Sequence, residues 1–129
     1  MTEYTKQNLR EVENASPKFG MPDGIEARFA RTALEGKSFG LSLMKLGPSF
    51  RVPFGHKHTE QEEVYVLLSG SARLKLDDEV LELAPLDAVR IGTGTMRAME
   101  AGPDGAEYIA FGAGQNPRDA EMEQGWWSE

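Results

Sequence analysis

The sequence predicts an all-β domain, an antiparallel sandwich or a small barrel. Short runs that alternate apolar and polar residues recur along the 129-residue chain, at roughly the ten-residue spacing of antiparallel strands and turns. The 14 glycines and 7 prolines are spread between these runs rather than gathered in a linker, which favours many short elements over a few long helices. No run has a convincing helical periodicity.

The alternating runs define about eight strands. The run at 64–68 is apolar at every position, so we expect a central strand that is covered on both faces. Asp77-Asp78 between two alternating runs is the strongest hairpin signal in the chain. Ser69-Gly70 is predicted to be a turn, and residues 101–105 are predicted to be a loop. A further element begins near the histidines. The other predicted strands cover residues 25–31, 38–46, 72–76, 79–83, 88–91, 97–100 and 107–111.

The length fits one domain with flanking segments. Residues 1–24 are polar and largely unpatterned, and we expect an extended N-terminal arm. Residues 25–112 hold the strands, and residues 113–129 form a C-terminal tail. Two adjacent tryptophans in this tail, Trp126 and Trp127, usually need a surface to pack on. We therefore expect the tail to pack on the barrel or on a partner subunit.

Composition excludes several functions. The 21 acidic residues exceed the 14 basic ones, for a formal net charge of −7, which opposes binding to nucleic acid or to an anionic membrane. The absence of cysteine excludes disulfides, thiolate zinc sites and a cysteine nucleophile. No window approaches the roughly 20 apolar residues of a membrane span, and the first residues lack the apolar core of a signal peptide. We expect a soluble, cytoplasmic protein.

The stretch Pro53–Gly70 contains the only two histidines, His56 and His58. One residue apart in a strand, they point the same way. Glu62 and Glu63 follow directly. Two imidazoles and a carboxylate suit a divalent first-row metal such as Fe, Mn, Ni, Cu or Zn. The spacing fits a polar loop before a buried strand equally well, and it does not choose between the two carboxylates.

This stretch resembles the first motif of the cupins, specifically the small single-domain kind. That motif is Gly, five residues, His-x-His, three or four residues, Glu, six residues and Gly. His56-Lys57-His58, Glu63 and Gly70 fit it, while Phe50 takes the place of the leading glycine. The count assigns the ligand position to Glu63 and makes Glu62 its outward neighbour.

The second cupin motif is Gly, five residues, Pro-x-Gly, two residues, His, three residues and Asn, and it matches poorly. Its middle glycine is kept as Gly94, but its histidine position is Arg97. The other departures are Leu86, Gly92 and Ala101, at the Gly, Pro and Asn positions. The resemblance covers residues 38–112. It implies an antiparallel jelly-roll β-barrel and a homodimer, with the N-terminal arm or an edge strand shared across the interface.

The resemblance also implies a metal held by His56, His58 and Glu63, with a histidine from the facing strand as fourth ligand. Arg97 cannot fill that position, because guanidinium has no lone pair to offer. Three arrangements follow. Arg97 faces the metal across an anionic substrate, or it replaces the metal and pairs with Glu63, or it turns out to solvent while another donor or water completes the metal shell.

Three further residues are candidates for substrate binding. Tyr65 shares the strand parity of Glu63 and is expected to line the same cavity. Gln61, between the histidines and Glu63, is within reach of the pocket mouth. Arg90 alternates with Val89 and Ile91, which is compatible with an interior position where it would help to hold an anion. Each residue also has a simpler interpretation. Tyr65 would belong to the packed core, Gln61 would be a solvated loop amide, and Arg90 would lie on the surface.

Three functions remain open. The first is a metal-dependent enzyme of dioxygenase or isomerase type that acts on a small anionic organic molecule. The second is a non-catalytic, metal-free cupin that binds or senses such a ligand, with Arg97 paired to Glu63. The third is a structural dimerisation unit. The fold leaves the reaction open.

Overall fold

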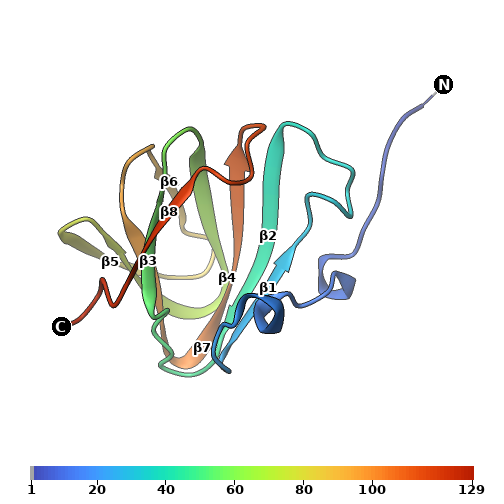
Figure 1. Cartoon of the computed structure of the whole chain (residues 1–129). Helices are drawn as coiled ribbons and strands as arrows, with labels where there is room; N and C mark the ends of the chain where they lie inside the picture. Colours follow the sequence, from blue (N-terminus) through green and yellow to red (C-terminus); the bar gives the residue numbers. More distant parts are fainter. Residues whose placement is uncertain (1) are drawn as a thin grey trace.

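The computed structural model describes residues 2–129, which form one eight-stranded antiparallel sheet that curls around its own core (Figure 1). The predicted all-β, jelly-roll barrel class is confirmed. The only helices in residues 2–129 are two short 3-10 helices, η1 (Leu9–Glu11) and η2 (Ser16–Phe19), and neither is long enough to cross a membrane. The strands are β1 (Ile25–Phe29), β2 (Phe39–Leu46), β3 (Phe54–His58), β4 (Glu62–Leu76), β5 (Glu79–Leu83), β6 (Ala88–Ile91), β7 (Arg97–Ala113) and β8 (Ala120–Gln124).

Two long strands, β4 and β7, run side by side through the barrel. Their pairing extends from Glu62 opposite Ala113 to Leu76 opposite Arg97. On its other side β4 pairs with β6 and then with β5, while β7 pairs with β2 and, at its start, with β3. The β4–β7 pair therefore connects the strands of both walls.

The predicted turn at Ser69-Gly70 and the predicted loop at residues 101–105 are wrong. Both segments lie inside strands, and the β4–β7 register shifts between Leu67 and Ser69 and again between Gly70 and Ala72. Such bulges bend a strand without ending it. Gly70 and Gly105 have φ values of +79° and +81°, which glycine adopts without a steric penalty. The segments around Gly70 and Gly105 are therefore bends within β4 and β7, and neither strand ends there.

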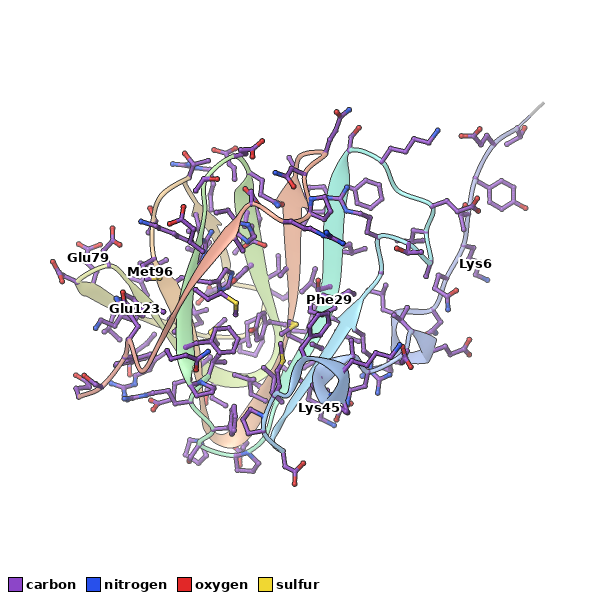
Figure 2. The ribbon with its side chains drawn as sticks, in the orientation of Figure 1. Lys6, Phe29, Lys45, Glu79, Met96 and Glu123 are labelled. Atoms are coloured by element: carbon purple, nitrogen blue, oxygen red, sulfur yellow. The ribbon has the colours of Figure 1, made fainter. Side chains whose placement is uncertain are left out.

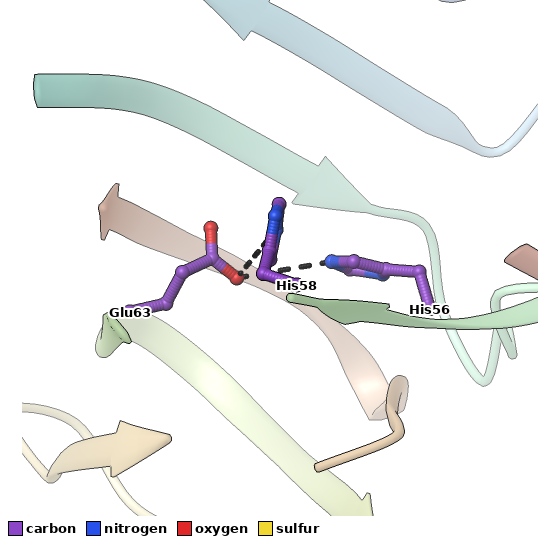
Figure 3. Close-up of side chains that lie close together, drawn as sticks. All are labelled: His56, His58 and Glu63. Carbon is purple, nitrogen blue, oxygen red and sulfur yellow. Dashed lines mark ion pairs between the residues drawn. The ribbon is translucent and has the colours of Figure 1, made fainter. Parts of the chain in front are cut away.

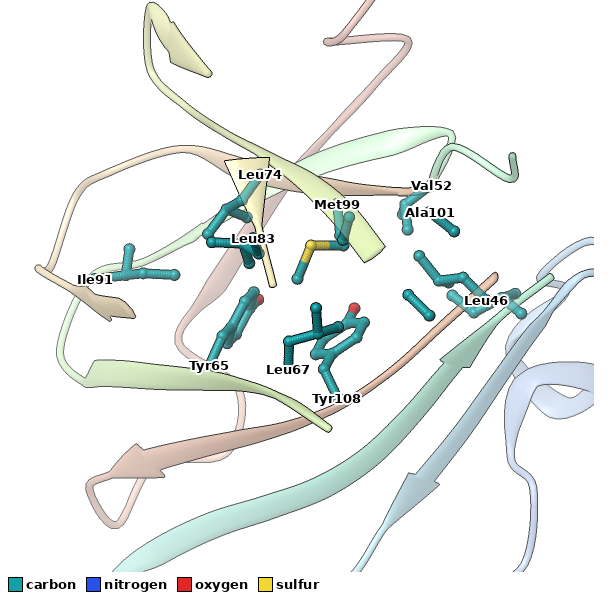
Figure 4. Close-up of a cluster of buried hydrophobic side chains, with 13 residues drawn as sticks. Leu46, Val52, Tyr65, Leu67, Leu74, Leu83, Ile91, Met99, Ala101 and Tyr108 are labelled. Atoms are coloured by element: carbon teal, nitrogen blue, oxygen red, sulfur yellow. The ribbon is translucent and has the colours of Figure 1, made fainter. Parts of the chain in front are cut away.

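The core lies inside the curled sheet, where side chains fill the space between its walls (Figures 2 and 4). Alternation along β4 directs Tyr65 and Leu67 inward, and each large apolar side chain buried there contributes about 1.5–3 kcal/mol. Tyr65 packs against Tyr108 of β7, with ring centroids 5.4 Å apart. These residues form the floor beneath the histidines and Glu63.

The N-terminal arm lies against the β1 and β2 side of the barrel (Figure 1). Arg10 donates two hydrogen bonds to the carboxylate of Glu107 on β7, one of them from Nη2 to Oε1 at 2.8 Å. Asn14 accepts a hydrogen bond from the backbone N–H of Ala27. These contacts fix the arm to the sheet.

The C-terminal segment adds a strand that the sequence did not indicate. β8 pairs with β3 from Phe54 opposite Gln124 to His58 opposite Ala120, so the sheet continues past residue 112. Trp127 is buried beneath the guanidinium of Arg51, 4.2 Å from the ring centroid. The tail packs on the barrel of its own chain through these contacts.

The bend at Gly70 provides a test of the fold. A Cβ at this position would overlap the carbonyl oxygen of Gly105, in addition to the strain of its positive φ. We expect Gly70→Ala to lower the free energy of unfolding by about 2–5 kcal/mol in urea denaturation. Gly20→Ala is the control, because Gly20 has φ +67° with nothing within 4 Å of a Cβ, and it should cost about 1–2 kcal/mol. Equal losses would contradict the close approach of β4 and β7.

Candidate functional site

Three strands carry the candidate site residues, and Figure 3 shows three of these side chains, those of His56, His58 and Glu63, pointing towards one another. His56 and His58 come from β3, Glu63 is the second residue of β4, and Arg97 is the first residue of β7. Antiparallel pairing sets His56 directly opposite Arg97. The two histidines share a face of β3, as their spacing predicts.

The carboxylate of Glu63 is the centre of the cluster. Its Oε1 lies 3.3 Å from His58 Nε2 and 3.7 Å from His56 Nε2. One ligand atom from each of the three residues lies within 4.8 Å of the others. The two imidazole rings are perpendicular, with centroids 5.1 Å apart. Two imidazoles and a carboxylate therefore converge at a spacing that a single metal ion can bridge.

Electrostatics keep Glu63 ionised. Burial acts to raise its pKa, but His56, His58 and Arg97 outweigh burial and lower the pKa to about 2. Burial lowers the pKa of His56, which favours its neutral form. For His58, burial also acts to lower the pKa, yet the carboxylates of Glu63 and Asp119 raise it overall. The two imidazoles are therefore not equivalent.

Arg97 is completely buried, with an exposed fraction of 0%. Its Nη1 donates to the carbonyl of Thr95 at 2.9 Å, and its Nη2 lies 3.4 Å from Glu63 Oε1. Within residues 2–129, neither Nε nor Nη2 has a hydrogen-bond partner. The arrangement in which Arg97 turns out to solvent is therefore wrong, because the start of β7 points its side chain inward beside β3.

Tyr65 is buried in the floor of the site. Burial first, and then the nearby Glu63 carboxylate, raise the pKa of its hydroxyl, so the hydroxyl stays protonated and can donate a hydrogen bond. Gln61 is also buried, and its side-chain amide is engaged in hydrogen bonds. Its amide donates to Asp119 Oδ1 at 2.8 Å and to the carbonyl of Asn116 at 3.3 Å.

Arg90 lies on the outer face of the barrel, away from the cluster. Its register explains this, because Arg90 stands opposite Val64 on β4, whereas its neighbours Val89 and Ile91 stand opposite the inward residues Tyr65 and Glu63. Arg90 donates to the carboxylate of Glu62 at 3.0 Å, and both side chains are exposed. The interior position considered for Arg90 is wrong, and Glu62 is the outward neighbour of Glu63, as the motif count indicates.

Sequence reasoning missed Asp119, which precedes β8. Its carboxylate is buried and lies 2.7 Å from His58 Nδ1. Burial acts to raise the pKa of Asp119, but the hydrogen bonds from His58, Gln61 and the backbone lower it well below the ordinary value. A lone aspartate in a polar tail carries no local signal, since only the pairing of β8 with β3 brings it to the histidines.

No sequence-family model matches this chain, and no curated protein matches it. Solved structures do match. A cupin protein from Bacteroides fragilis is 23% identical, with a TM-score of 0.72 over 91% of this chain and 89% of that one. The chain has the cupin fold.

Two further cupin-like structures are named for their activities. Pac13 of Streptomyces, a nucleoside dehydratase, is similar at 16% identity and TM-score 0.75 in a variant with uridine, covering 96% of this chain and 93% of Pac13. A cupin-superfamily sugar phosphate isomerase from Silicibacter pomeroyi is similar at 18% identity and TM-score 0.71, covering 92% of both chains. At these identities the likeness establishes the cupin barrel, and the site residues must indicate the chemistry.

The charge environment of Glu63 can be tested in metal-free protein by following its side-chain carboxyl carbon through an NMR pH titration. We expect a midpoint near pH 2, against 4.5 for an unperturbed glutamate. Because the folded-state pKa is depressed, the stability that this group contributes is present above about pH 4.5 and is lost as the pH falls towards 2. Arg97→Met should raise the midpoint. An unshifted midpoint in the wild type would contradict the described cluster.

Proposed function

We propose that this cupin barrel is a metal-dependent enzyme that acts on a small anionic organic molecule. His56, His58 and Glu63 hold a divalent ion of Fe, Mn, Ni or Zn, and Arg97 receives the negatively charged group of the substrate. The observation that carries the proposal is the convergence of two imidazoles and a carboxylate within 4.8 Å, beside a buried guanidinium whose Nη2 has no hydrogen-bond partner in residues 2–129.

The donor set fits such an ion. Neutral imidazole and carboxylate suit first-row divalent metals, and a set of two histidines and one carboxylate leaves coordination positions open. Glu63 Oε1 is buried without a hydrogen bond in the described chain, which is the unsatisfied state that a cation would relieve. When bound, the ion would supply Lewis-acid chemistry and an open position for a substrate oxygen or water.

Arg97 provides the charge that selects an anion. A buried guanidinium needs compensation, and the approach of Nη2 to a single carboxylate oxygen at 3.4 Å is longer than an ordinary charge-assisted hydrogen bond. A substrate carboxylate or enolate beside Arg97 would satisfy the free N–H groups. The protonated hydroxyl of Tyr65 is positioned to orient such a ligand from the floor of the site.

The comparisons support a small organic substrate in a general way. Proteins that share the cupin fold include a nucleoside dehydratase, a sugar phosphate isomerase and an oxalate decarboxylase. Their reactions differ from one another, so the fold leaves the reaction of this chain open. What they share is a barrel that accepts a small polar molecule.

A metal-free binding protein is the second candidate, and the contact between Arg97 and Glu63 favours it. In this alternative the guanidinium replaces the cation and the pair lines a pocket that binds a ligand without turning it over. Arg97→His distinguishes the two candidates. A metal-free wild type whose Arg97→His variant takes up metal would favour the binding protein.

Elemental analysis of protein purified without a histidine tag tests the metal site. After dialysis against Fe, Mn, Ni or Zn, we expect about one ion per chain, since structural and catalytic sites of this type are stoichiometric. Glu63→Gln and His56→Ala should each lose the ion. Lys57→Ala is the matched control, because Lys57 lies between the histidines on the opposite face of β3. Absence of any bound ion in the wild type would contradict the proposal.

Calorimetric titration with malonate tests the role of Arg97. We expect Arg97→Met to weaken malonate binding about 10- to 100-fold, because a charge-assisted hydrogen bond is lost, while metal content is retained. Arg90→Met removes an arginine from the outer face and should leave binding unchanged. If the two variants bind malonate with the same affinity, Arg97 is not the anion-binding residue.

A further inference from the structure

The carboxylate of Asp119 accepts four hydrogen bonds, although the proposed metal site and substrate contacts do not include this residue. Its Oδ1 accepts from His58 Nδ1 at 2.7 Å and from the Gln61 side-chain amide at 2.8 Å. Its Oδ2 accepts from the backbone N–H groups of Glu60 and Gln61, at 2.8 and 3.0 Å. The side chain has an exposed fraction of 0%. One donor is His58, at the end of β3, and the other three belong to Glu60 and Gln61 in the segment that connects β3 with β4.

We propose that Asp119 is a positioning residue that holds His58 in the tautomer protonated at Nδ1, so that Nε2 offers its lone pair towards Glu63. This inference rests on the proposed metal site, in which Nε2 of His58 is a ligand atom. An ionised carboxylate only accepts hydrogen bonds. Because Oδ1 faces the ring nitrogen at 2.7 Å, Nδ1 must carry a proton, and the neutral ring then has its free lone pair on Nε2.

The other histidine lacks this support. No hydrogen bond to Nδ1 of His56 is formed within residues 2–129, and its side chain is 24% exposed, against 11% for His58. The ring of His58 is therefore fixed in orientation and tautomer, whereas His56 has more freedom. A carboxylate partner of this kind orients a metal-binding histidine and raises its basicity.

Gln61 in turn holds the carboxylate of Asp119 in place. Its amide bridges Asp119 and the carbonyl of Asn116, and its Oε1 lies where a Cβ on Gly112 would be. Gly112 stands opposite Glu63 in the β4–β7 register. The C-terminal segment, the β3–β4 connection and the end of β7 thus form one network that ends at His58.

Asp119→Asn tests the proposal, because it keeps the size of the side chain and changes its hydrogen-bonding pattern. The amide oxygen should remain towards the backbone N–H groups of Glu60 and Gln61, because these two donors cannot become acceptors. At the other position the His58 ring can change its tautomer and the Gln61 side-chain amide can flip. The amide NH₂ then faces His58 Nδ1, which must become an acceptor. The ring proton moves to Nε2 and blocks the ligand atom.

Two measurements follow this change. In metal-free protein, at a pH high enough for both imidazoles to be neutral, ¹⁵N–¹H correlation spectra should show His58 protonated at Nδ1 in the wild type and at Nε2 in Asp119→Asn. The affinity for Mn²⁺ or Zn²⁺ should fall about 10- to 100-fold in this variant. Glu121→Gln makes the same chemical change at an exposed position on β8 and should alter neither quantity.

The outcomes separate this inference from the proposed function. If Asp119→Asn keeps Nδ1 protonated and binds metal as the wild type does, Asp119 is not a positioning residue, although the metal site stands. If the wild type binds no metal, the proposed function fails, and the tautomer measured in metal-free protein still decides the role of Asp119. Should Asp119→Asn not fold, Asp119→Ala replaces it. A mixture of tautomers in that variant supports the proposal, and Nδ1 protonation alone overturns it.

Discussion

The carboxylate of Glu63 is largely buried inside the curled sheet, and three side chains that can carry positive charge surround it. An ionised carboxylate in such a place is stable only when it is paired. His56, His58 and Arg97 all approach the same oxygen within 3.7 Å, yet that oxygen has no hydrogen bond within residues 2–129. The cluster is therefore charged and incompletely satisfied, and this is the feature on which the proposed metal site rests.

The barrel fixes this cluster through strand parity and register. Glu63, Tyr65 and Leu67 share the inward face of β4, and a slip of one residue would exchange all three with the outward residues. Bends at Gly70 and Gly105 let β4 and β7 remain paired over both walls. The start of β7 consequently meets β3, where Arg97 stands opposite His56. The rigid parts of the site are thus set by sheet geometry, and Asp119 adds a hydrogen bond that orients His58.

Local patterns in the sequence predict most strands and the four residues of the cluster, His56, His58, Glu63 and Arg97, because parity and motif spacing act over a few positions. Two kinds of feature were not predictable in this way. Ser69-Gly70 has turn chemistry, but long-range pairing with β7 keeps the strand continuous. Asp119 is distant in sequence from His58, and its position depends on β8, a strand of only five residues that are all exposed. Arg90 was ambiguous for a related reason, since its inward or outward direction depends on the β4–β6 register.

The most direct test of the central claim is anomalous diffraction from crystals grown with Mn²⁺. The account predicts one anomalous peak within about 2.3 Å of Nε2 of both histidines and of a carboxylate oxygen of Glu63, with Arg97 facing its open side. A site with no peak, in which Arg97 and Glu63 instead form a closed bidentate pair, would contradict it.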